Sequence, residues 1–211
     1  SRSVELVSEF KKILPLAKSV FGGKHVLAIP DEIKNNDDID YLVWGPVYET
    51  IDKIIESPVK TTIKGAPAYP CDMQPALTEY FEQVPRMGRR ERKYIMSHFG
   101  CVYNCSFCCT SVTRKSYGAK AYKEYWLARR PVENMIEEAK LFLKYPTKEI
   151  SFEDDDVLYG THEGADGTQW LEEFTKAWKK EINIPMYANV TPQTVVNATS
   201  AALSTLAELA D

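Results

Sequence analysis

The feature that most constrains the fold is an alternation of strand-like and helix-like patterns over residues 91–211. Short runs rich in β-branched and aromatic residues lie at 92–99, 149–152 and 185–190, and each is followed along the chain by a stretch with helical spacing of apolar residues. The helices are predicted at 131–143, 168–181 and 193–209. This order is typical of a parallel sheet, either open or closed into a barrel. We therefore expect an α/β fold with three successive βα units in this part of the chain.

The first part of the chain alternates in the same way on a smaller scale. The elements expected there are a helix at 4–14, strands at 17–21 and 40–45, and a helix at 48–55. Five prolines then interrupt residues 58–90, where only 76–83 has helical spacing, which is the composition of a linker. We therefore divide the chain into a first domain at 1–57, a linker at 58–90 and a second domain at 91–211.

A compact group of cysteines follows the first strand of the second domain. Cys101, Cys105 and Cys108 have the spacing C-x3-C-x2-C, and Cys109 comes directly after them. Three soft thiolates on one short loop can hold a four-iron four-sulfur cluster. Three protein ligands leave one iron open to chelate a small molecule while an electron passes to it. The spacing therefore indicates a catalytic cluster rather than one that only transfers electrons.

Two other interpretations of the cysteines remain open. They could bind zinc, with Cys109 or Cys71 as a fourth ligand, or they could be buried small hydrophobic residues. Zinc sites usually have two C-x2-C pairs separated by a longer spacer, whereas this chain has one compact group. The adjacent pair Cys108 and Cys109 would also strain tetrahedral ligation. We therefore favour the iron–sulfur interpretation.

Composition narrows the cellular context. The net charge of -4 comes from 26 basic and 30 acidic residues mixed along the chain, without the long basic stripe that follows a phosphate backbone, so nucleic-acid binding is unsupported. The crowded cysteines do not form the spread pattern of a disulfide framework, and no apolar signal segment opens the sequence. Charged residues interrupt every hydrophobic stretch before the roughly 20 residues that a membrane helix needs. We expect a cytoplasmic protein that does not enter the membrane.

The cysteine spacing, Phe107 directly before the last cysteine and the preceding strand resemble the signature of the radical S-adenosylmethionine superfamily. The resemblance implies that S-adenosylmethionine chelates the open iron through its amino and carboxylate groups. An electron from the cluster then cleaves the sulfonium to give a 5'-deoxyadenosyl radical. The resemblance also implies that Phe107 lies beside the adenine and that the three βα units form the first half of a parallel βα barrel.

An acidic run follows the second predicted strand, where the superfamily usually has a Gly-Gly-Glu-type motif that holds the methionine amino group. The run is Glu153, Asp154, Asp155 and Asp156, which departs from the glycine form. The resemblance implies that Glu153, Asp154 and Asp155 bind the ammonium group, because carboxylates accept its hydrogen bonds. A solvated loop or an N-terminal charge for the next helix is the alternative. Asn189, at the end of the third strand, is expected to face the same side of the barrel.

Three further polar residues lie near the expected rim of the sheet. His98 and His162 are candidates for proton transfer by position only, and we expect them to be structural or surface histidines. Thr191 is expected to cap the last helix, with Pro192 at its first position. The sequence does not identify a catalytic residue.

The first domain resembles the end of the Rossmann-like cobalamin-binding domain that precedes the barrel in one large subfamily of radical S-adenosylmethionine enzymes. The resemblance rests on residues 21–25, 29–33, 39–45 and 49–50. In such domains paired glycines let the backbone approach the nucleotide tail of the corrinoid, and the resemblance implies this role for Gly22 and Gly23. An ordinary turn is the alternative. The Asp-x-His-x-x-Gly loop typical of many such domains is not in this sequence.

The resemblance as a whole implies a fragment of an enzyme that transfers a methyl group through cobalamin to an unactivated carbon. Its partners would be an electron donor such as flavodoxin or ferredoxin and a small-molecule or peptide substrate, which later strands would select. One alternative is a methylthiotransferase-like enzyme without cobalamin, although such enzymes usually carry three more cluster cysteines upstream and only Cys71 lies there. The other alternative is a non-catalytic zinc-binding module.

Overall fold

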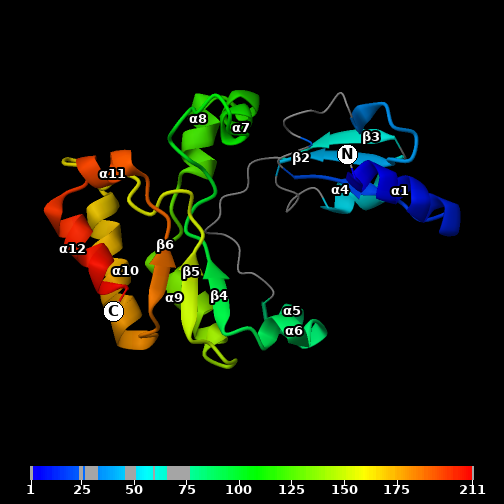
Figure 1. Ribbon diagram of the computed structural model, residues 1–211. Helices are drawn as coiled ribbons and strands as arrows, with labels where there is room; N and C mark the ends of the chain where they lie inside the picture. The colour runs from blue at the N-terminus through cyan, green and yellow to red at the C-terminus, as the bar shows by residue number, and fades with distance from the viewer. Residues whose placement is uncertain are drawn as a thin grey trace. The chain divides into compact units, whose positions relative to one another are not determined.

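The structure is a computed structural model that describes residues 2–23, 26, 33–45, 51–58, 60–65 and 77–210. The chain divides into two compact units. The first is formed by Ser1–Ala68 with Tyr103–Tyr125, and the second by Tyr69–Val102 with Trp126–Asp211. Each unit contains one three-stranded parallel sheet together with helices (Figure 1), so the predicted α/β class is confirmed. Residues 103–125, which the sequence analysis grouped with the second domain, belong to the first unit.

The first unit is built around strand β2, which lies between the two other strands of its sheet. Among the described residues before Ala68, its elements are α1 (Arg2–Ile13), β1 (Val20–Phe21), β2 (Tyr41–Trp44), α4 (Ile51–Glu56) and β3 (Thr61–Lys64). Leu42 packs with Val26 and Ile33, whereas Val43 belongs to a separate cluster with Ile54. Successive residues of a strand point to opposite faces, so β2 is covered on both sides. This double burial explains its continuous apolar sequence.

Strand β3 lies in the stretch 58–90 that was predicted to be a linker, so that prediction is wrong for residues 61–64. β3 runs parallel to β2, with Thr61 opposite Tyr41. Only Ile63 of its four residues is buried, so the sequence lacks the apolar run that marks an interior strand. The short helix predicted at 76–83 is confirmed as α5 (Leu77–Gln83), and α6 (Pro85–Gly88) follows it.

The second unit contains the three βα units predicted from the sequence. Its elements after α6 are β4 (Arg92–Ile95), α9 (Val132–Phe142), β5 (Glu149–Phe152), α10 (Gly167–Glu181), β6 (Met186–Ala188), α11 (Pro192–Asn197) and α12 (Ser200–Glu208). The strands pair in the order β4-β5-β6 and are all parallel. Ile95 lies opposite Phe152 and Phe152 opposite Ala188, so the three carboxyl ends share one edge of the sheet.

The single helix predicted at 193–209 is two helices, which corrects the sequence analysis. The chain is extended at Ala198 and Thr199, and the Thr199 hydroxyl accepts a hydrogen bond from the amide of Ala202 at 3.1 Å. A threonine that caps a new helix therefore interrupts the periodic apolar pattern. Thr191 caps α11 in the same way, as predicted, by accepting from the amide of Thr194.

The core of the second unit is held by an aromatic group on α10. Phe174 is fully buried, meets Phe152 of β5 edge to face at 5.5 Å between ring centroids, and stacks on Trp170 at 5.2 Å. Trp178, one turn later, is also buried and lies 5.3 Å from Phe174. α10 in turn packs against α9 and α12. One helix face therefore ties the sheet to its two neighbouring helices.

We expect Phe174→Ala to lower the free energy of unfolding of the second unit by about 3–5 kcal/mol, because it removes a buried ring and leaves a cavity. Val196→Ala, at a position that is 79% exposed on α11, should change it by less than about 0.5 kcal/mol. Urea unfolding followed by tryptophan fluorescence measures both variants. Equal effects of the two substitutions would contradict the central position of Phe174 in the core.

Candidate functional site

Strand β4 ends at Ile95, four residues before the end that the sequence predicted, because a side chain takes the place of the neighbouring strand. The last β-type hydrogen bond runs from the Glu153 amide to the Ile95 carbonyl, at 2.8 Å. Beyond it the amides of Ser97 and His98 donate to Oδ1 of Asp154, at 2.7 and 3.3 Å. The chain that leads to the cysteines is thus tied to a carboxylate at the end of β5.

Residues 101–125, which we call the cysteine segment, lie in the chain between two stretches of the second unit that form a closed base. The amide of Phe99 donates to the carbonyl of Trp126 at 3.1 Å, and the amide of Arg130 donates to the carbonyl of Ser97 at 2.9 Å. The outgoing residues 97–99 and the returning residues 126–130 are therefore bonded to each other. The base is a defined structure from which the cysteines are presented.

The second and third cysteines of the motif lie in one turn that opens a helix. The amide of Cys108 donates to the carbonyl of Cys105 at 3.1 Å, and α7 (Thr110–Tyr117) begins directly after Cys109. Cys105 is exposed and Cys108 is half-buried. The partial positive charge at a helix N-terminus favours thiolates and other anions. This turn suits a pair of thiolate ligands to a metal cluster.

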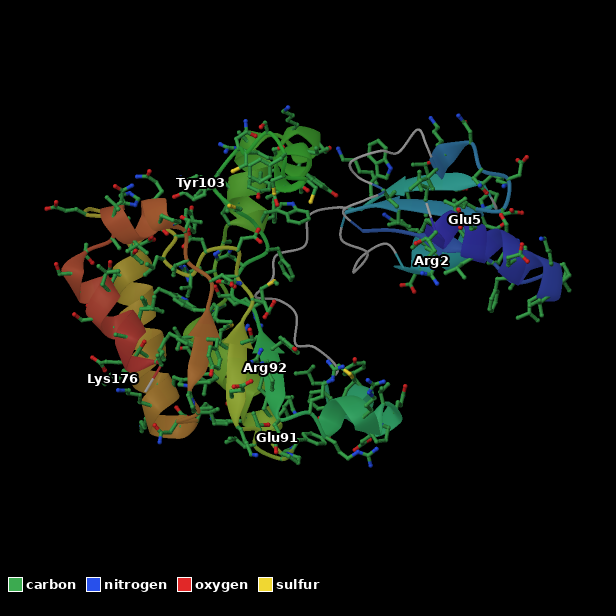
Figure 2. All side chains as sticks on the ribbon, in the orientation of Figure 1. Arg2, Glu5, Glu91, Arg92, Tyr103 and Lys176 are labelled. Carbon is green, nitrogen blue, oxygen red and sulfur yellow. The ribbon has the colours of Figure 1, made fainter. Side chains whose placement is uncertain are left out.

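Cys101 is half-buried, and Tyr103, labelled in Figure 2, lies between it and Cys105 in the sequence. Among the residues that the structure describes, no group of three or more His, Cys, Asp and Glu side chains is close enough to hold a metal ion. Cys71, the alternative fourth ligand for zinc, lies outside the described residues. The case for a cluster therefore rests on the chemistry and spacing of three thiol donors.

Phe107 is 91% exposed, although it is aromatic and lies between two cysteines of the motif. Single exposed apolar side chains are common at protein surfaces, so this exposure shows only that the ring is accessible. This exposure is compatible with the predicted position of Phe107 beside an adenine.

The acidic run after β5 alternates between buried and exposed residues. Asp154 and Asp156 are 0% and 1% exposed, whereas Asp155 is exposed and Glu153 is half-buried. Both oxygens of Asp154 accept hydrogen bonds from Ser97. The carboxylate of Glu153 accepts one from Ser151 at 2.6 Å. Asp155 thus has the most accessible carboxylate of the three that the resemblance assigns to the ammonium group.

Asp156 has a similar structural role beside β6, the other neighbour of β5. Its carboxylate accepts hydrogen bonds from the hydroxyl of Thr191 at 2.7 Å and from the hydroxyl of Thr194 at 2.8 Å. It also accepts from the amide of Leu158 at 3.1 Å. These contacts hold the start of α11 after β6. Asp154 and Asp156 therefore anchor the chain beyond the two neighbours of β5.

Asn189 lies just past the end of β6, and the structure brings it to the acidic run. Its side-chain amide donates to the carbonyl of Asp154 at 3.3 Å, and its own carbonyl accepts from the amide of Val157 at 3.0 Å. The residue is exposed. Asn189 therefore lies at the same edge of the sheet as the acidic run, and its predicted position in a barrel stays a prediction.

His98 is buried beside the same carboxylate. Its Nε2 lies 3.3 Å from Oδ2 of Asp154, and its ring meets that of Tyr159 edge to face at 5.7 Å. Burial lowers the pKa of His98 below its ordinary value, Asp154 opposes this and Arg129 adds to it. His98 is therefore a structural histidine, and His162 is exposed at the surface.

Gly22 and Gly23 follow β1 at its carboxyl end. Gly23 has φ of +96°, in the left-handed region that side chains disfavour, and no atom among the described residues lies within 4 Å of a Cβ added there. A Cβ on Gly22 would only make an ordinary contact with the carbonyl of Val43 at 3.7 Å. The backbone conformation at Gly23, rather than crowding by the protein, thus requires glycine.

Two contacts near the candidate site could not be predicted as such from the sequence. Arg129 joins the base of the cysteine segment, where its Nη2 donates to the carbonyls of Val157 and Tyr159 at 2.7 and 2.8 Å. In the first unit the Tyr117 hydroxyl lies 3.2 Å from the carbonyl of Trp44, and a Cβ on Gly45 would lie only 1.7 Å from that hydroxyl. Gly45 after a predicted strand was the available signal for the second contact, whereas a single arginine gives no signal for the first.

Comparison with family models and with curated proteins gives no match to this chain. Among the described residues, no helix has the length and apolar character required to cross a membrane.

The lowered pKa of His98 predicts a pH dependence of stability. In the unfolded chain this histidine binds a proton below about pH 6.5, whereas in the folded protein its lowered pKa means that it binds a proton only at lower pH. The stabilisation is therefore fully present above that pH and is lost as the pH falls toward the folded pKa. We expect a smaller slope of unfolding free energy against pH in His98→Gln than in the wild type, measured by urea unfolding between about pH 7.5 and 5. His162→Gln should keep the wild-type slope, and a wild-type slope in His98→Gln would refute the assignment.

Proposed function

We propose that this chain is part of a radical S-adenosylmethionine enzyme whose four-iron four-sulfur cluster is held by Cys101, Cys105 and Cys108. The observation that carries the proposal is the C-x3-C-x2-C motif on a segment that leaves a parallel sheet just beyond the carboxyl end of β4. Ligand sites in parallel α/β sheets lie at the carboxyl ends of the strands. The first cysteine of the motif, Cys101, thus follows in the chain the edge of the second unit at which ligands of such sheets bind.

The residues present fit such a cluster by their chemistry. Three thiolates are the soft ligands that iron–sulfur clusters require, and the turn from Cys105 to Cys108 opens α7. When bound, the cluster would supply the electron that cleaves S-adenosylmethionine reductively to a 5'-deoxyadenosyl radical. A low-potential donor such as flavodoxin or ferredoxin would reduce it.

The chain's own polar and aromatic residues would then orient S-adenosylmethionine. Phe107 offers an exposed ring to the adenine. Asp155, and Glu153 beside it, offer carboxylates to the ammonium group from the end of β5. The side chain of Asn189 lies at the same edge, after β6. In this proposal the second unit is the first half of a parallel βα barrel.

We propose cobalamin-dependent methyl transfer as the use of this chemistry, in a cytoplasmic enzyme. The supporting observation is the pair Gly22 and Gly23 directly after β1, where a Cβ would make one ordinary contact at Gly22 and would meet no described atom within 4 Å at Gly23, whereas the space beside Gly45 is filled by Tyr117. Glycines at the carboxyl ends of parallel strands let a large ligand approach the backbone. The first unit would then be the end of a Rossmann-like cobalamin-binding domain.

Anaerobic reconstitution with iron and sulfide tests the cluster. We expect the wild-type chain to acquire a four-iron four-sulfur cluster, seen by iron and sulfide content and by electron paramagnetic resonance after reduction. Each of Cys101→Ser, Cys105→Ser and Cys108→Ser should lose most of it, because each removes one of three ligands. Cys109→Ser is the matched control and should retain it.

Stoichiometric zinc without iron or sulfide, lost equally in Cys109→Ser, would instead support the zinc-binding module and overturn the proposal. If iron binds and S-adenosylmethionine is not cleaved by the reduced protein, the cluster assignment stands and the radical chemistry fails.

The cobalamin part has its own test. Gly23→Ala should weaken the binding of hydroxocobalamin by about tenfold or more, since a methyl group occupies the space where the corrinoid approaches. Gly164→Ala is the matched control, because Gly164 also has a positive φ, of +80°, with no described atom within 4 Å, and it lies in the second unit. Spectrophotometric titration measures both. A wild-type chain that does not bind hydroxocobalamin would exclude this part and favour an enzyme without cobalamin.

A further inference from the structure

The base of the cysteine segment converges on a single buried side chain. Asp154 is 0% exposed, and its Oδ1 accepts hydrogen bonds from the amides of Ser97 at 2.7 Å and His98 at 3.3 Å. Its Oδ2 accepts from the hydroxyl of Ser97 and lies 3.3 Å from Nε2 of His98. Ser97 and His98 precede Cys101 by four and three residues. The outgoing leg of the segment is thus fixed by this carboxylate.

The returning leg reaches the same carboxylate through Arg129. Its Nη1 lies 3.9 Å from Oδ2 of Asp154 and donates to the hydroxyl of Ser97 at 3.4 Å. The guanidinium also lies over the ring of Trp170, with Cζ 4.6 Å from the ring centroid. Arg129 is therefore fixed on several sides, and its charge compensates that of the buried carboxylate.

We propose that Asp154 is a positioning residue that fixes both legs of the cysteine segment and thereby sets where Cys101 is presented to the cluster. The part that concerns the cluster rests on the proposed function, whereas the part that concerns the two legs rests on the hydrogen bonds alone. Asp154 then has a different task from the ammonium binding that the resemblance assigns to the acidic run. Its carboxylate oxygens accept hydrogen bonds within the protein, whereas the exposed carboxylate of Asp155 is the one proposed to bind the ammonium group.

Asp156 provides a matched comparison for this role. It lies two residues away, is 1% exposed and also accepts several hydrogen bonds through its carboxylate. Its partners Thr191 and Thr194, however, lie at the start of α11 and not at the base of the cysteine segment. Asp154→Asn and Asp156→Asn both remove a buried charge while they preserve the shape of the side chain. A loss of general stability should appear in both variants, whereas a loss of position in the cysteine segment should appear only in Asp154→Asn.

Hydrogen exchange on the chain without metal measures the effect on the two legs. The informative amides are those of Phe99 and Arg130, which donate across the base to the carbonyls of Trp126 and Ser97 and not to the carboxylate of Asp154. We expect their protection to fall by about tenfold or more in Asp154→Asn and by less than about threefold in Asp156→Asn. Equal changes in the two variants would overturn the proposal, whether or not the wild type binds a cluster.

Reconstitution measures the effect on the cluster separately. We expect Asp154→Asn to hold less iron and sulfide than Asp156→Asn, or to give a reduced cluster with an altered paramagnetic resonance spectrum. A wild-type spectrum and content in Asp154→Asn would refute the role in presenting Cys101. If the wild type binds no cluster, the proposed function fails, and hydrogen exchange still decides the role of Asp154 at the base.

If Asp154→Asn does not fold, Ser97→Ala replaces it, because it removes only the hydroxyl that donates to Oδ2. It should lower the protection of Phe99 and Arg130 in the same direction by a smaller factor. Unchanged protection in Ser97→Ala would then count against the proposal.

Discussion

The second unit depends on how the charge of Asp154 is compensated. A buried carboxylate is costly unless hydrogen bonds and a cation replace the water it has lost. Here the compensation comes from Ser97 and His98 on one leg of the cysteine segment and from Arg129 on the other. If either leg separated from the sheet, the buried carboxylate would lose part of this compensation. The burial of Asp154 and the geometry of the base therefore depend on each other.

The acidic run after β5 combines two tasks because β5 is the central strand. Beyond the end of β5, Asp154 and Asp156 are buried while Asp155 between them is exposed. The buried residues reach the two neighbouring connections, Asp154 the one after β4 and Asp156 the one after β6. The acidic run thus combines two buried structural carboxylates, Asp154 and Asp156, with the exposed carboxylate of Asp155.

The sequence predicts the fold of the second unit well because its signals are local. β5 has the predicted bounds, since its apolar alternation ends where the acidic run begins. The end of β4 was misplaced because the residues after Ile95 are still strand-like and only the distant Asp154 diverts them. β3 was missed because its pairing with β2, rather than its own sequence, makes it a strand. For the candidate site, the three thiols follow from spacing, whereas Arg129 and the structural task of Asp154 depend on contacts between distant residues.

In the first unit, the helix that follows the cysteines contacts the carboxyl ends of two strands of the sheet. Tyr117, in the last turn of α7, lies within hydrogen-bonding distance of the carbonyls of Trp44 and Gly65, where β2 and β3 end. Lys64 adds a hydrogen bond to the carbonyl of Ser116 at 3.0 Å. The helix that begins at the cysteine turn is therefore held at the carboxyl ends of the first sheet, which is where parallel sheets bind ligands. α7 therefore occupies part of that edge itself, because Tyr117 fills the space that a side chain at position 45 would take.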